Sequence, residues 1–223
     1  MITTSAELEA LVGNLPTSES ASVGIDLEAD NLHRYAEQLC LIQISDGKDV
    51  FLVDPLEVDD LSSLERFLAA ESIWMHGADF DMTLLRREFG TLPKMIFDTQ
   101  IAARLLGILR FSYANLVDQF FDVKLCKASQ KDNWGQRPLP EKMREYASND
   151  VRYLLPLANA LEDTLRDKGR YEWFVESCQA AMKRVLSREV EKEDPWRIRG
   201  AGKLDRQALC LLRALWQLSL IHI

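Results

Sequence analysis

Three strand-like segments in the first 55 residues constrain the fold more than any other feature of this sequence. Residues 23–28 alternate apolar and polar side chains, which is the pattern of a strand with one buried face. Residues 39–46 and 49–55 follow, and the turn Asp-Gly-Lys joins them. This close spacing predicts an antiparallel meander of three strands.

The rest of the chain has mainly helical periodicity. One short buried strand is expected at 72–76, and the polar segment 124–139 is expected to be a loop. Helices are predicted at 5–11, 61–70, 79–89, 98–106, 113–121, 140–167 with a kink at Pro156, 171–193 and 204–216. This order predicts an α/β fold, with a mixed sheet flanked by helices and a helix-rich C-terminal half.

Charge is unevenly distributed along the chain. Residues 1–182 contain 18 basic and 30 acidic side chains (net −12), whereas residues 183–223 contain 9 and 5 (net +4). We expect one domain over 1–193 and the incomplete start of a helical unit over 196–223. The final LSLIHI does not look like a continuation of the preceding helix, so a truncated or fused reading frame is its simplest explanation.

Several classes of protein are excluded at this level. No apolar run reaches the roughly 20 residues of a membrane span, and the N-terminus lacks the features of a secretory signal. A zinc site or a disulfide framework is not expected, because the cysteines are widely scattered: Cys40, Cys126, Cys178 and Cys210. We therefore expect a cytoplasmic protein. Its acidic body does not suit non-specific nucleic-acid binding unless carboxylates hold divalent cations.

One pair of carboxylates suggests such a cation site. Asp26 and Glu28 are two residues apart in a predicted strand, so both side chains point to the same face. On a sheet surface flanked by apolar residues, their repulsion is costly unless a cation is bound. The alternative is coincidence, because a chain with 18 Asp and 17 Glu contains such a pair about once by chance.

Two further segments supply candidate groups. Asp81 lies in the first turn of a predicted helix after a buried strand, where active sites of α/β folds gather. Its alternative role is to stabilise the helix dipole. Tyr146 and Asp150 are four residues apart on a predicted helix, so they share one face. Their alternative is a half-buried tyrosine beside a solvated aspartate.

Three motifs in order resemble those of the DEDD superfamily of 3′–5′ exonucleases, in the subgroup with a tyrosine in the third motif. They are GIDLEAD at 24–30, HGADFD at 76–81 and YASND at 146–150. The segments LCLIQIS, FDTQIAARLL and DVRYLLPL are similar to the ribonuclease D family. The resemblance covers roughly residues 20–190, and the segment from about Pro195 resembles the start of the helical (HRDC-type) domain found in that family.

This resemblance implies a ribonuclease H-like fold and a metal-dependent exoribonuclease. Its substrate would be the 3′ end of single-stranded RNA, in the processing of tRNA or other structured RNA, with no small-molecule cofactor beyond two Mg²⁺ or Mn²⁺ ions. By position, Asp26, Glu28 and Asp150 would hold one ion. Asp26 would bridge to the second ion, with Asp81 near it. Tyr146 would orient or deprotonate the attacking water.

Five residues are predicted to bind substrate. The backbone of Leu27 and the side chain of His76 are expected near the terminal nucleotide. In the loop, Trp134 would stack on a base while Lys127 and Arg137 contact phosphate. The alternatives are a packed His76 and an inward-packed Trp134. Two rival functions remain: a DNA exonuclease, and a non-catalytic RNA-binding module. The expected mark of the second is a lost carboxylate, and none is missing.

Overall fold

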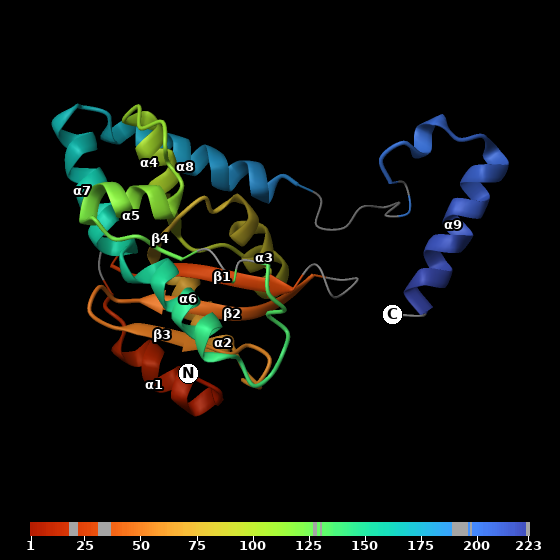
Figure 1. Ribbon diagram of the computed structural model, residues 1–223, viewed down its shortest axis with the longest axis horizontal. Helices are drawn as coiled ribbons and strands as arrows, with labels where there is room; N and C mark the ends of the chain where they lie inside the picture. Colours follow the sequence, from red (N-terminus) through yellow and green to blue (C-terminus); the bar gives the residue numbers. More distant parts are fainter. Residues whose placement is uncertain are drawn as a thin grey trace.

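The computed structural model describes residues 1–17, 22–30, 37–126, 129, 131–188, 196 and 198–221 (Figure 1). The strands are β1 Gly24–Asp30, β2 Gln38–Ser45, β3 Val50–Val53, β4 Ser72–Met75 and β5 Met95–Asp98. The helices are α1 Ser5–Asn14, α2 Ser62–Ala70, α3 Asp79–Phe89, α4 Thr99–Leu105, α5 Tyr113–Phe121, α6 Glu141–Arg152, α7 Leu154–Asp167, α8 Tyr171–Leu186 and α9 Arg206–Ile221. A short 3₁₀ helix spans Ala201–Lys203.

Strand β1 lies at the centre of a sheet whose order is β3-β2-β1-β4-β5. The antiparallel pairs β1–β2 and β2–β3 confirm the predicted meander. Strand β4 pairs in parallel with β1 on one side and with β5 on the other, so the sheet is mixed, as predicted. As in any β-strand, the side chains of β1 point alternately to the two faces of the sheet.

Helices cover both faces (Figure 1). A core containing Leu8 of α1, Leu64 of α2 and Leu84 of α3 packs against Ile25 and Ile42 of the sheet. A second core lies among α4, α5, α7, α8 and strand β4. Helix α6 packs with the loop before it on β2 and β3, which places this helix over the meander.

Strand β5 was not predicted from the sequence. Its four residues follow a proline at position 93. The last of them, Asp98, caps helix α4 by accepting a hydrogen bond from the backbone N–H of Gln100 at 2.7 Å. A segment this short has no readable period, and its strand character comes from parallel pairing with β4. The partly buried Phe97 packs against Trp74, with ring centroids 5.2 Å apart.

The predicted long helix at 140–167 is two helices, and the break is not at Pro156. Helix α6 ends at Arg152 and α7 begins at Leu154, with Tyr153 in a turn conformation between them. The freed N–H of Tyr153 donates to the hydroxyl of Tyr113 at 3.2 Å. Pro156 lies in the first turn of α7, where a proline needs no backbone donor.

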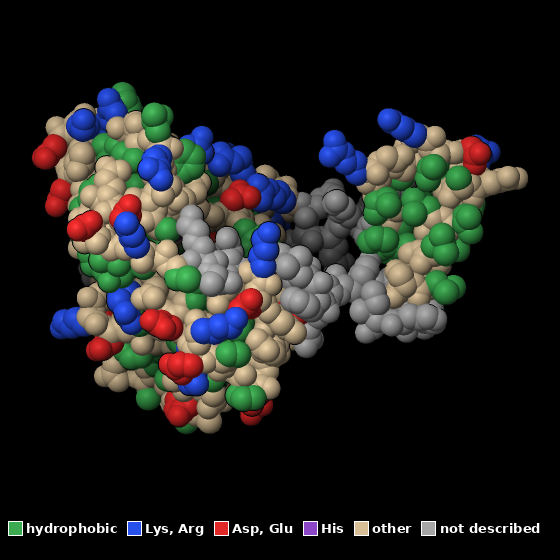
Figure 2. Space-filling view, viewed as in Figure 1, with side chains coloured by type: hydrophobic (Ala, Val, Ile, Leu, Met, Phe, Trp, Pro, Cys, Tyr) green, Lys and Arg blue, Asp and Glu red, His purple; other side chains and the backbone are tan. Residues whose placement is uncertain are grey.

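The C-terminal region differs from the prediction at two points. Helix α8 ends at Leu186 rather than at 193, and residues 189–195 lie outside the described part of the chain. Helix α9 continues to Ile221, so most of the LSLIHI segment does continue the helix. Figure 1 shows α9 apart from the sheet, and Figure 2 shows apolar side chains gathered on it.

None of the helices described here combines the length and the apolar character that a bilayer span requires.

Candidate active site

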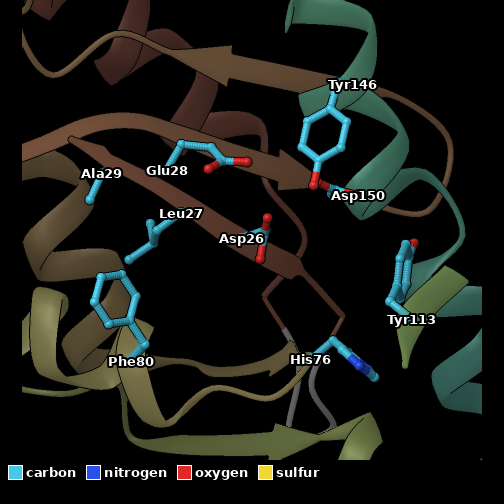
Figure 3. A pocket seen from close by; sticks show the side chains of 9 residues that line it. All are labelled: Asp26, Leu27, Glu28, Ala29, His76, Phe80, Tyr113, Tyr146 and Asp150. Atoms are coloured by element: carbon cyan, nitrogen blue, oxygen red, sulfur yellow. The ribbon is translucent and has the colours of Figure 1, made fainter. Parts of the chain in front are cut away.

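Two carboxylates project from the central strand over the α6 face of the sheet (Figure 3). Asp26 pairs across the strands with Gln43, and Glu28 pairs with Leu41. A register shift follows between Glu28 and Ala29, where a β-bulge locally interrupts the regular pairing with β2. The predicted common face of Asp26 and Glu28 is therefore found at the centre of the sheet.

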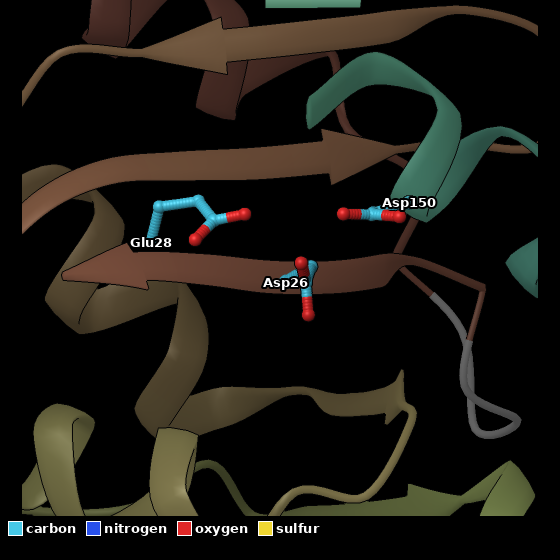
Figure 4. A group of neighbouring side chains, drawn as sticks. All are labelled: Asp26, Glu28 and Asp150. Carbon is cyan, nitrogen blue, oxygen red and sulfur yellow. The ribbon is translucent and has the colours of Figure 1, made fainter. Parts of the chain in front are cut away.

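Helix α6 brings a third carboxylate to this pair. Asp150 lies in its last turns, and one oxygen each from Asp26, Glu28 and Asp150 lie within 4.8 Å of one another (Figure 4). Tyr146, one turn earlier, points its hydroxyl at Asp150 and forms a hydrogen bond with it (Figure 3). Two segments more than 110 residues apart in the sequence thus converge on one point.

Asp81 lies beside this cluster rather than within it. It is 7% exposed in the first turn of α3, and its charge raises the pKa of Asp26, after the larger effect of burial. The preceding turn is fixed by the carboxylate of Asp98, which accepts hydrogen bonds from the N–H groups of Gly77 at 2.8 Å and Ala78 at 3.0 Å. Gly77 has a positive φ of 66°, which favours glycine at this position.

Burial raises the pKa of all four carboxyl groups. The pKa of Glu28 rises to about 9, first through lost hydration and then through repulsion by Asp150 and Asp81. The pKa values of Asp81 and Asp150 both rise to about 7, again mainly through burial. Burial also raises the pKa of Asp26, with the other three charges adding to the effect. Without a cation, the cluster therefore retains protons near neutral pH.

Two further groups at the site are neutral at pH 7. Burial, followed by the charge of Asp150, raises the pKa of Tyr146 above its ordinary value, so its phenol stays protonated. Burial lowers the pKa of His76, whose Nδ1 lies 2.9 Å from Oγ1 of Thr99. His76 is therefore an uncharged group beside the carboxylates.

The carboxylates open into a cavity of about 410 Å³ (Figure 3). Leu27 and His76, both predicted near the substrate, line it. Phe80, which is 44% exposed, and Tyr113 also line it and were not predicted. Phe80 could have been found from its place between Asp79 and Asp81 in HGADFD, whereas nothing in the sequence around Tyr113 indicates the site.

The loop residues predicted to bind substrate have other positions. Trp134 is 1% exposed and packs toward Tyr146, with ring centroids 6.0 Å apart, so stacking on a base does not fit this geometry. Arg137 donates to both oxygens of the fully buried Asp54 at 2.6 and 2.7 Å, and to the carbonyl of Cys40 at 2.7 Å. It anchors the loop to the sheet because a buried carboxylate requires a partner. Lys127 lies outside the described residues.

The side chains present fit a hard divalent cation. Asp26, Glu28 and Asp150 offer only oxygen atoms, which Mg²⁺ and Mn²⁺ prefer. The raised pKa values also favour a bound cation, because the cluster is costly to ionise without a compensating positive charge.

Comparison with known proteins agrees with this fold and identifies the family. Residues 1–166 match a family model described as 3′–5′ exonuclease. The chain belongs to the 3′–5′ exonuclease family.

The relatives it matches are ribonuclease D proteins. Ribonuclease D of Psychromonas ingrahamii is 33% identical over 225 residues, covering 98% of this chain and 59% of the relative. Ribonuclease D of Escherichia coli K12 is 35% identical over 203 residues, covering 88% and 54%. The chain thus spans less than two thirds of the length of these relatives.

Solved structures give the same result. The crystal structure of E. coli RNase D, described as an exoribonuclease involved in structured RNA processing, has a TM-score of 0.79 and 32% identity. It is matched over 98% of this chain and 59% of that one. The catalytic core of RRP6 from Trypanosoma brucei has a TM-score of 0.81 and 28% identity, over 97% and 61%. The fold is therefore that of the ribonuclease H-like exonucleases.

The raised pKa of Asp81 predicts a pH-dependent effect on stability. Because the folded-state pKa is raised from 3.8 to about 7, the unfolded chain loses its proton first, and stability falls as the pH rises between these values. An asparagine at this position cannot ionise. We therefore expect Asp81→Asn to raise the metal-free melting temperature, with a gain that grows from pH 4 to pH 7 and then levels off. Calorimetry in EDTA measures it, and a gain independent of pH would contradict the assignment.

Binding of a divalent cation should offset the stability that the buried carboxylates lose as the pH rises. A ligand that binds only the folded state at 100 times its Kd adds about 2.7 kcal/mol, which is roughly 5–10 °C for a chain of this size. We expect millimolar Mn²⁺ to raise the wild-type melting temperature at pH 8, and to do so less at pH 6 and in Asp81→Asn. Identical melting curves in EDTA and in Mn²⁺ would exclude a cation site formed by these carboxylates.

Proposed function

We propose that this chain is the catalytic part of a metal-dependent 3′–5′ exoribonuclease that removes nucleotides one at a time from single-stranded RNA. The observation that carries the proposal is the convergence of Asp26, Glu28 and Asp150 with Tyr146 at the wall of one cavity. The ribonuclease D relatives favour RNA over DNA as the substrate.

Each acidic residue has a distinct position in this proposal. Asp26, Glu28 and Asp150 would hold one Mg²⁺ or Mn²⁺ ion, and Asp26 with Asp81 would hold a second. Such a pair of ions stabilises the charge on the attacking and leaving oxygens of a phosphodiester. The carboxylates must lose protons to bind the ions, so activity should rise with pH through the neutral range.

Tyr146 orients the attacking water in this proposal rather than deprotonating it. Its pKa is raised by burial, so at neutral pH the phenol is a hydrogen-bond group without charge. The hydrogen bond to Asp150 fixes the direction of the hydroxyl at the edge of the carboxylate cluster. Neutral His76 would contact the substrate by hydrogen bonding rather than by charge.

The cavity suits a terminal nucleotide. Its volume of about 410 Å³ lies within the range of about 300–1,000 Å³ that is typical of small-ligand sites. The half-exposed ring of Phe80, beside Leu27, offers an apolar surface for a base next to the carboxylates. We propose that the 3′-terminal base packs there while its phosphate faces Asp26.

The substrate in the cell is proposed by the same reasoning. A 3′-end trimming activity on tRNA or other structured RNA fits the ribonuclease D relatives. We propose that the protein acts in the cytoplasm, where these RNAs are present.

A labelled oligonucleotide tests the activity. Single-stranded RNA with a 5′ label, and its DNA analogue, are incubated with Mg²⁺, Mn²⁺ or EDTA, and the products are sized. We expect a ladder shortened by single nucleotides from RNA, and none in EDTA. Equal degradation of DNA would favour a DNA exonuclease. RNA binding without cleavage would favour the non-catalytic module.

The C-terminal segment is proposed to be a separate unit. On α9, Leu211, Leu215 and Leu218 are each more than half exposed. The catalytic body extends at least to Arg188, which donates to Asp79 at 2.8 and 2.9 Å and whose carbonyl accepts from Arg86 at 2.7 Å. We therefore place residues 196–223 at the start of a second helical domain.

Deletion tests this boundary. Removing residues 196–223 should leave turnover on short RNA within about twofold, because the residues of the proposed site lie before Arg188. Binding to longer RNA at low salt should weaken, since basic side chains leave with the segment. Steady-state kinetics on short and long RNA measure both effects. An unfolded or inactive deletion protein would show that the boundary is misplaced.

A further inference from the structure

Gln43 of strand β2 lies next to the carboxylate cluster. It pairs with Asp26 on one side and with Leu52 of β3 on the other. Residues directly opposite each other in antiparallel strands face the same side of the sheet, with Cβ atoms about 4.5–5.5 Å apart. The amide of Gln43 therefore lies on the same face as the Asp26 carboxylate, under helix α6.

The amide is fully buried and has no partner among the described residues. Gln43 is 0% exposed, and neither its Nε2 nor its Oε1 forms a hydrogen bond. A buried amide without partners is costly, and native structures seldom retain one. Asp54, in the adjoining turn after β3, shows the usual arrangement, because its buried carboxylate is fully paired with Arg137.

The surroundings leave few roles for this amide. Its neighbours across and along the strands on this face are the buried apolar Leu41 and Leu52, the carboxylate of Asp26, and the buried Ser45, whose hydroxyl already accepts from the N–H of Gly47 at 3.2 Å. A leucine or methionine would pack against the first two equally well. The nearby group that gains from an amide donor is the carboxylate directly opposite, because a carboxylate is a strong acceptor for an amide N–H.

We infer that Gln43 is a positioning residue for the cation site, whose Nε2 donates to the carboxylate of Asp26 when that side chain holds a cation. The inference rests on the proposed function, since it assumes that Asp26 binds a cation. The separation set by the strand register is within the length of the two side chains. The amide would hold the direction of the Asp26 carboxylate by donating to one of its oxygens. Groups of this kind typically change metal affinity by about 10–100-fold when removed.

The test compares one substitution at two positions of β2 in the full chain. Gln43→Met removes the amide and keeps the side-chain volume, whereas the control Gln38→Met makes the same change opposite Asp30, at the other end of the strand. Titration calorimetry gives the Kd for Mn²⁺, and scanning calorimetry in EDTA gives the metal-free melting temperature. We expect Gln43→Met to weaken Mn²⁺ binding about 10–100-fold without lowering the metal-free melting temperature. Gln38→Met should keep the wild-type Kd.

Each outcome distinguishes the inference from the proposed function. If wild type binds no Mn²⁺, the proposed function fails. If wild type and Gln43→Met bind Mn²⁺ equally, the inference is overturned and the proposed function is untouched. A lower metal-free melting temperature with an unchanged Kd would assign Gln43 a packing role and also overturn it. Gln43→Leu, which is smaller and also apolar, gives the same comparison if the methionine variant does not fold.

Discussion

Asp26→Asn is expected to abolish RNA trimming, with a rate loss of several orders of magnitude. Asp26 is the carboxylate on which the acidic neighbours act together, because the other three each raise its pKa. Asparagine keeps the shape of the side chain but cannot supply the negative charge that the proposed cations need. Initial rates on 5′-labelled RNA with saturating Mn²⁺ measure the loss.

The metal-free stability of the same variant separates a lost ligand from a lost fold. Removing one of several repelling, buried carboxylates should raise the melting temperature in EDTA. Asp118→Asn, on the exposed side of α5, is the matched control and should retain wild-type rates. Undiminished trimming by Asp26→Asn would exclude this cluster as the catalytic centre.

Tyr146→Phe is expected to slow hydrolysis by about 10²–10⁴-fold, the range typical of a lost orienting or acid–base group. The phenol forms a hydrogen bond with Asp150 but is not one of the three grouped carboxylates, so Mn²⁺ binding should persist. Single-turnover kinetics give the rate, and the Mn²⁺-induced rise in melting temperature gives the binding.

A second tyrosine provides the control for this change. Tyr171 begins helix α8, and the guanidinium of Arg166 lies 3.6 Å from the centre of its ring. Tyr171→Phe removes a hydroxyl but keeps this ring contact, so we expect unchanged turnover. If Tyr146→Phe also lost the Mn²⁺-induced melting shift, Tyr146 would be part of the cation site rather than a group that orients water.

The parts of this site that sequence could predict are those set by local periodicity. Side chains two residues apart on a strand share a face, and so do side chains four residues apart on a helix. The pairs Asp26–Glu28 and Tyr146–Asp150 could therefore be predicted without a structure. The two pairs meet because α6 packs on the sheet, and periodicity alone does not predict this packing. The expectation that the two pairs form one site came from the resemblance in three ordered motifs.

Other features depend on tertiary contacts that no local pattern contains. Strand β5 is recognisable only through its pairing with β4. The break between α6 and α7 occurs at Tyr153, whose N–H donates a hydrogen bond to the hydroxyl of Tyr113 in helix α5. For Trp134 the sequence left base stacking and inward packing open, and its burial decides for packing. Arg137 was predicted to contact phosphate, but its ion pair with Asp54 gives it a structural position.

The role inferred for Gln43 also could not be predicted from the sequence. In the sequence it is one of three polar residues in a mainly apolar strand, and nothing there assigns it chemistry. Its meaning comes from the register, which places it opposite Asp26, and from burial that leaves its amide without a partner among the described residues.

Anomalous diffraction from a crystal soaked in MnCl₂ at pH 8 tests the catalytic centre most directly. We expect a strong manganese peak between the carboxylate oxygens of Asp26, Glu28 and Asp150, and its loss in a crystal of Asp150→Asn treated in the same way. Ordered side chains at these three positions with no manganese peak at saturating Mn²⁺ would contradict a metal-dependent exonuclease site at this cluster.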